Sequence, residues 1–122
     1  MLKGTTMEIS LQKCYESVTT DIYRVVLMHD EHDVELIKLL KQRGYSLYDV
    51  DLNNHWFLEI HNADKTIHTD KYGTFMFMFS FRGGIRLRDL QTKDILDNVK
   101  KLIDNPDKDY YFSLLTNKRK VI

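Results

Sequence analysis

A short run of histidines and carboxylates is the stretch of this sequence best suited to chemistry. Residues 29–33 read His-Asp-Glu-His-Asp and lie between an apolar segment and a predicted helix. Imidazole and carboxylate groups bind zinc, manganese and iron, and functional groups often lie where a strand leads into a helix. One hypothesis is therefore a small metal-dependent hydrolase or nuclease. Its divalent metal ion would be bound by His29, Asp30, His32 and Asp33.

The spacing of these residues favours a different interpretation. His29 and His32 are three positions apart, so their side chains converge only if the helix has already begun at His29. We prefer the alternative in which Asp30 or Glu31 caps the helix and the histidines face solvent. On that interpretation the protein needs no cofactor.

A second group of ionisable side chains falls on a predicted hairpin. If residues 62–65 form a four-residue loop, His61 faces Thr66 and Glu59 faces His68. Glu59 and the two histidines would then share one face of the sheet, and a carboxylate beside an imidazole is a candidate acid–base pair. Such a trio is more often the polar face of an exposed sheet, and we favour that role.

Residues 74–81 predict a strand that is apolar on both faces. Successive side chains alternate, so four phenylalanines share one face, and Met76 and Met78 share the other. If helices cover one face, the other can bury against a homodimer partner or a different protein, and methionines suit such an adaptable surface.

The paired glycines Gly83–Gly84 predict a tight hairpin turn after this strand, with residues 85–89 returning along it. Phenylalanines and arginines would then face each other on an open sheet, as in sheets that stack single-stranded nucleic acid. We prefer the interpretation in which Phe79 and Phe81 belong to the hydrophobic core, and Arg86 and Arg88 are edge residues that discourage aggregation.

The elements predicted around these groups give an α+β domain over residues 1–122, with residues 1–6 and 117–122 expected to be loose. Its small antiparallel or mixed sheet of about four to six strands is a variant of the ferredoxin-like, or split βαβ, arrangement. Two to three helices pack mainly on one face. Residues 7–18 fit either a helix or a strand. The predicted strands are 22–28, 45–51, 55–61, 66–69 and 110–115, and the predicted helices are 31–43 and 93–104, the second capped by Thr92.

Composition limits the class of protein further. Eighteen acidic and eighteen basic side chains give no net charge, which disfavours nucleic acid as the partner. A single cysteine, Cys14, excludes an internal disulfide and suits a reducing compartment, where we expect it to be a buried hydrophobe. No apolar run approaches the roughly 20 residues that span a bilayer. We therefore expect a soluble cytoplasmic protein with no membrane partner.

Two scarce residue types point to the origin of the sequence. Alanine and proline each occur once, as Ala63 and Pro106, which is typical of AT-rich genomes and suits a low-GC bacterium, or a virus or mobile element living in one. No phosphate loop, dinucleotide fingerprint or HExxH motif is present. The leading hypothesis is therefore a non-enzymatic inhibitor that binds and occludes a host defence protein. Its candidate binding residues are Asp49, Asp51, Met76, Met78, Arg86 and Arg88, together with the acidic Asp107 and Asp109.

Overall fold

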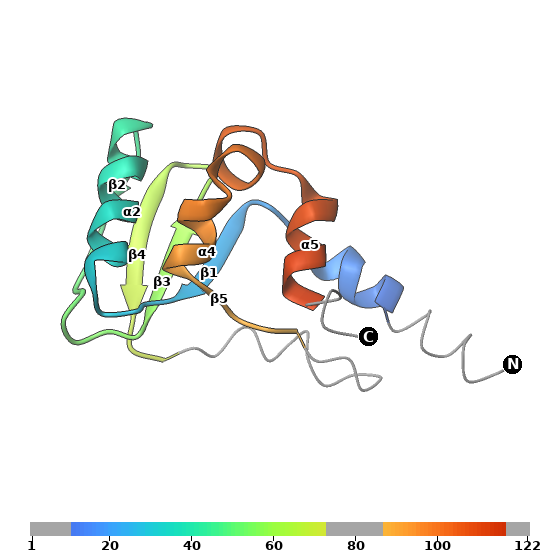
Figure 1. Ribbon diagram of the computed structural model, residues 1–122, viewed down its shortest axis with the longest axis horizontal. Helices are drawn as coiled ribbons and strands as arrows, with labels where there is room; N and C mark the ends of the chain where they lie inside the picture. The colour runs from blue at the N-terminus through green and yellow to red at the C-terminus, as the bar shows by residue number, and fades with distance from the viewer. Residues whose placement is uncertain (1–10, 73–86, 117–122) are drawn as a thin grey trace, which may run out of the picture.

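Strand β1 (Ile22–Val26) lies inside a five-stranded mixed sheet, as its continuous apolar run predicted (Figure 1). The computed structural model describes residues 11–72 and 87–116. The strand order is β2-β4-β3-β1-β5. The other strands are β2 (Ser46–Leu47), β3 (Phe57–His61), β4 (Thr66–Asp70) and β5 (Leu90–Gln91).

The strand directions make this sheet a split βαβ variant. β1 is antiparallel to β3, β3 is antiparallel to β4, and β4 is parallel to β2. β1 and β2 are therefore parallel, are connected through α2 (Glu31–Gln42), and have β3 and β4 between them. β5 adds a parallel strand on the other side of β1. The predicted α+β class, with a mixed sheet of this kind, is confirmed.

Helix α2 has nearly the predicted bounds, but its buried face includes the polar residue Asp33 and excludes Val34. The buried stripe runs through Asp33, Leu36, Ile37 and Leu40, at helical spacing. Val34, an apolar residue of the same helix, is 49% exposed. The helix ends before Gly44, whose φ of +91° is a conformation that glycine adopts without strain.

The helices cover the sheet face that carries Tyr23, Leu58 and Ile60, all of them completely buried in one core cluster. The Tyr23 hydroxyl donates to the Leu102 carbonyl (2.6 Å), and its ring packs on that of Tyr111 at 4.6 Å. Residues 11–17 are helical, which settles the choice left open for that segment, and bury Cys14 as expected. Burial raises the pKa of the Cys14 thiol. No helix among the described residues is long and apolar enough to cross a membrane.

The helix predicted over residues 93–104 is interrupted. It comprises α4 (Thr92–Asp97) and a π-helical turn, η2 (Lys100–Asp104), separated at Asn98. The Asn98 side chain donates to the Asp94 carbonyl (2.8 Å), and such local bonds from asparagine compete with regular helix. The predicted cap was also wrong, because α4 is preceded by Gln91, whose N–H donates to Asp94 (2.8 Å).

The strand predicted over Tyr110–Leu115 is wrong: this segment lies in helix α5 (Lys108–Thr116). The Asp107 carboxylate accepts a hydrogen bond from the N–H of Tyr110 (3.1 Å) and so caps the first turn. The apolar positions also fit a helical face, with Tyr111, Phe112, Leu114 and Leu115 buried. A short apolar run with this spacing is compatible with either element, and the cap favours the helix.

The strand predicted over residues 45–51 shortens to β2. Tyr48 still donates its N–H to Ile67 (2.8 Å), but Asp49 has a φ of +56°, which turns the chain out of the sheet. Residues 87–89, the end of the predicted returning strand, are irregular. The apolar strand over residues 74–81 and its glycine turn lie outside the described residues.

Candidate functional site

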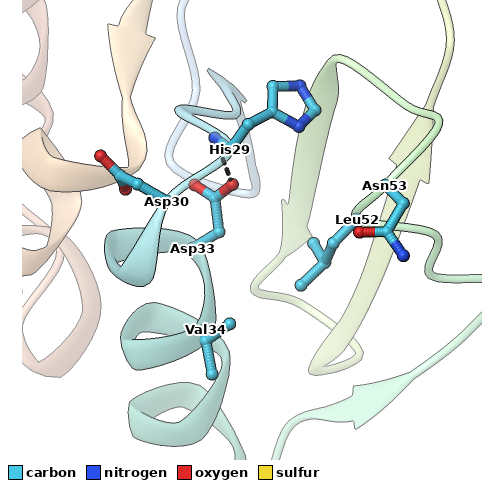
Figure 2. A pocket seen from close by; sticks show the side chains of 6 residues that line it. All are labelled: His29, Asp30, Asp33, Val34, Leu52 and Asn53. Carbon is cyan, nitrogen blue, oxygen red and sulfur yellow. Dashed lines mark hydrogen bonds between the residues drawn. The ribbon is translucent and has the colours of Figure 1, made fainter.

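A surface pocket of about 460 Å³ opens where β1 leads into α2. Figure 2 shows Leu52 and Asn53, from the β2–β3 loop, facing α2 across the pocket, with His29 at one end. Two apolar and four polar or charged residues line it: Val34 and Leu52, with His29, Asp30, Asp33 and Asn53.

The buried carboxylate of Asp33 holds the turn that forms one wall. It accepts hydrogen bonds from the backbone N–H of Met28 (3.0 Å) and of His29 (2.8 Å; dashed in Figure 2). It also accepts one from the Thr92 hydroxyl (2.7 Å), which ties α4 to the start of α2. Asp33 is 2% exposed and Thr92 is completely buried. Asp33 is therefore a structural clamp whose oxygens are both occupied.

Asp30 caps α2, as the preferred interpretation predicted. Its carboxylate accepts from the backbone N–H of His32 and from the His32 ring, both at 2.9 Å, and points away from Leu52 (Figure 2). These bonds hold the pKa of Asp30 below its usual value, the backbone bond first. The bond from Asp30 raises the pKa of His32.

The Asp30–His32 pair predicts a measurable titration. We expect the His32 ring to titrate above an ordinary histidine in an NMR pH series, and Asp30→Asn to return it toward the ordinary value. Because the His32 pKa is raised, its stabilising effect is complete below its unfolded-state pKa and is lost as the pH rises through the folded-state pKa. Because the Asp30 pKa is lowered, its effect is lost as the pH falls through that pKa. An unchanged His32 titration in Asp30→Asn would contradict this pairing.

The opposite wall, formed by Leu52 and Asn53 of the loop over residues 48–56, is also held by hydrogen bonds within that loop. The Asp51 carboxylate accepts from the backbone and side chain of Asn54 (3.1 and 3.0 Å), and these bonds lower its pKa. The buried Thr69 hydroxyl donates to the Asp49 carbonyl (3.2 Å) and accepts from the Asp51 N–H (2.7 Å). The pocket is therefore preformed, with both walls fixed by internal hydrogen bonds.

The rim of the pocket is apolar and accessible. The Trp56 ring packs edge-on against that of His29 at 4.8 Å and is 56% exposed. Val34, from the first half of α2, is also exposed beside the pocket. His29 has a φ of +59°, an uncommon conformation for a residue other than glycine, which places its ring next to Trp56. Large exposed apolar side chains around a concavity are typical of a binding surface.

The four predicted metal ligands lie close together in the sequence and in the structure, but the two carboxylates already accept hydrogen bonds from other groups of the protein. Asp33 binds backbone N–H groups and Thr92, and Asp30 binds His32. Within residues 11–72 and 87–116, no group of three or more His, Cys, Asp or Glu side chains is arranged to hold a metal ion.

The other predicted binding residues are dispersed. Asp49 and Asp51 lie in the pocket loop, whereas Asp107 and Asp109 lie at α5, on the other side of the molecule (Figure 1). The Asp109 carboxylate accepts from the Tyr15 hydroxyl (2.6 Å). Arg88 is paired with Asp94 (2.8 Å), so it is not available to stack a nucleic-acid base. Five residues of these predictions lie outside the described chain: Met76, Met78, Phe79, Phe81 and Arg86.

The predicted hairpin group does form, on the sheet face opposite the core. Glu59 pairs with His68 and His61 with Thr66, in the expected register. The group also includes Arg24, which the sequence analysis missed because it lies within an apolar run. Arg24 is 2% exposed and forms an ion pair with Glu59. Burial lowers the pKa of Arg24, and the Glu59 charge opposes that shift.

These features define a small α+β domain with a preformed surface pocket that has a mixed apolar and polar lining. No family model matches the sequence, and comparisons with curated proteins and with solved structures find no similar chain.

Proposed function

We propose that this protein is a non-enzymatic binding module that docks on a partner protein through the rim of its pocket. The observation that supports the proposal is the exposed pair Trp56 and Val34 beside a preformed cavity. Tryptophan is enriched at the energetically dominant positions of protein interfaces, and a rigid surface loses little conformational entropy on binding.

A catalytic role for the same pocket has less support. A hydrolase needs a carboxylate or imidazole that can exchange protons or hold a metal ion. Both oxygens of Asp33 accept buried hydrogen bonds, and Asp30 is committed to the helix cap. Asp30 and His32 are accessible but are bonded to each other, which leaves the exposed His29 imidazole, and one imidazole is a poor metal site.

The partner that we propose is a protein of the host cell, inhibited because the module covers its working surface. The AT-rich composition motivates this choice, since it suits a phage or mobile element that must block host defence. The zero net charge favours a mixed apolar and polar contact over mimicry of nucleic acid.

The test is affinity capture from a nuclease-treated lysate of the native host, using tagged wild type and Val34→Asp. We expect one stoichiometric protein that survives nuclease treatment and is lost from Val34→Asp, because the new charge would be buried in the apolar contact. Lys13→Asp is the matched control, since it places the same side chain at an exposed position of the helix over residues 11–17. Equal capture by both variants, or a partner released by nuclease, would refute the proposal.

A further inference from the structure

Two imidazoles lie side by side on the sheet face opposite the core. The ring centroids of His61, on β3, and His68, on β4, are 4.3 Å apart, and the rings are tilted by 49°. Antiparallel pairing places the two residues on a diagonal, because His61 is opposite Thr66 and His68 is opposite Glu59. Both are partly exposed; the His61 side chain is 25% accessible, so solvent reaches the pair.

Hydrogen bonds assign the proton on each ring. His61 Nε2 lies 3.1 Å from a Glu59 oxygen, and a carboxylate only accepts, so Nε2 carries the proton. The Thr66 hydroxyl donates its only proton to Asp64 (2.8 Å). His68 Nε2, 2.9 Å from the same hydroxyl, must therefore donate to it. In the neutral form of both rings, the lone pair is then on Nδ1.

This protonation pattern is the one found in metal-binding histidines. Such residues donate the nitrogen that is not bound to metal to a carboxylate or another oxygen, which orients the ring. With metal–nitrogen bonds of about 2.0–2.1 Å along the ring axis, two centroids on one ion lie about 4.5 Å apart at a right angle and about 5.2 Å apart at a tetrahedral angle. The observed 4.3 Å is near the spacing that two imidazoles on one ion require, and the general affinity order of divalent metals favours Cu²⁺ at such a site.

We propose that His61 and His68 bind one divalent transition-metal ion, Cu²⁺ or Ni²⁺ ahead of Zn²⁺, through their Nδ1 atoms, with water completing the coordination. The neighbouring Arg24 does not add a net charge, because Glu59 is its ion-pair partner. Two protein ligands give a weaker site than the three or four of closed zinc sites, so we expect a Kd on the order of 10 µM. This site is independent of the proposed pocket function.

The test is calorimetric titration of the full chain with CuCl₂ and with NiCl₂. We expect one ion per chain, and at least a tenfold weaker Kd in His61→Gln and in His68→Gln. The matched controls, His29→Gln and His32→Gln, should bind as the wild type does. Unchanged affinity in the His61 and His68 variants, or loss in the control variants, would overturn the proposal.

A second readout does not depend on variants. Trp56 is the only tryptophan, and its ring contacts His29, whereas His61 lies five residues further along the chain, about 17 Å away in extended conformation. Cu²⁺ bound at His61 and His68 should leave most of the Trp56 fluorescence. Saturable, nearly complete quenching would instead locate the ion at residues 29–33 and overturn the assignment.

Discussion

Replacing Asp33 with alanine is expected to lower the free energy of unfolding by about 3–5 kcal/mol, measured by urea denaturation. The substitution leaves the N–H groups of Met28 and His29 and the hydroxyl of Thr92 without their acceptor. An unpaired buried polar group costs about 1–3 kcal/mol. The total stays below the sum of three such costs because Met28 and His29 are only partly covered and can recruit water.

Three further variants separate the parts of this effect. Asp30→Ala removes an exposed cap of the same helix and should lower the free energy of unfolding less than Asp33→Ala does. Asp33→Asn keeps one acceptor oxygen and should fall between the two. Thr92→Val removes only the link to α4, and its cost should not add to that of Asp33→Ala in a double-mutant cycle. If Asp33→Ala lowers the free energy of unfolding no more than Asp30→Ala does, the hydrogen bonds of Asp33 contribute little to stability.

Trp56→Ala is expected to weaken binding to the captured partner about 30-fold, equivalent to about 2 kcal/mol, in surface plasmon resonance. An exposed tryptophan at the centre of an interface removes more apolar surface from water than any other side chain on this rim. The free energy of unfolding should change by less than about 1 kcal/mol, because more than half of the side chain is already exposed.

Tyr48→Ala is the matched control for that measurement. Tyr48 is 62% exposed and its ring packs against that of His68, on the sheet face away from the core. Its removal should leave partner affinity within about twofold if the pocket rim is the contact. Equal losses in both variants would favour a different or much larger interface, and a loss only in Tyr48→Ala would move the contact to the β2 edge.

Local signals predicted the fold well where they agreed with one another. The register of β3 and β4 followed from one four-residue loop, because side chains alternate strictly once the loop length is known. α5 failed because its short apolar run has no decisive periodicity, and the cap by Asp107 at its start was overlooked. β2 is shorter than predicted because the positive φ of Asp49 leaves no trace in a sequence with β-forming neighbours.

The pocket lies beside residues 29–33, which the sequence had singled out, but the contacts of these residues were only partly predicted. The sequence singled out residues 29–33 and the cap by Asp30. The clamp role of Asp33 was missed, although a signal existed: Asp33 lies three and four positions before Leu36 and Ile37 and thus on the buried stripe. Leu52 and Asn53 could not be assigned to the pocket, because only the tertiary fold brings their loop next to α2.

The split βαβ arrangement has a consequence for the order in which the chain assembles. Within the described part of the chain, β2 pairs only with β4, whose residues are synthesised about twenty positions later, and β3 and β4 must insert between β1 and β2. A nascent chain that has not yet released residue 70 therefore has α2 but no partner for β2. We expect β2 to be the last strand added to this end of the sheet, docking on a β3–β4 hairpin already held by β1.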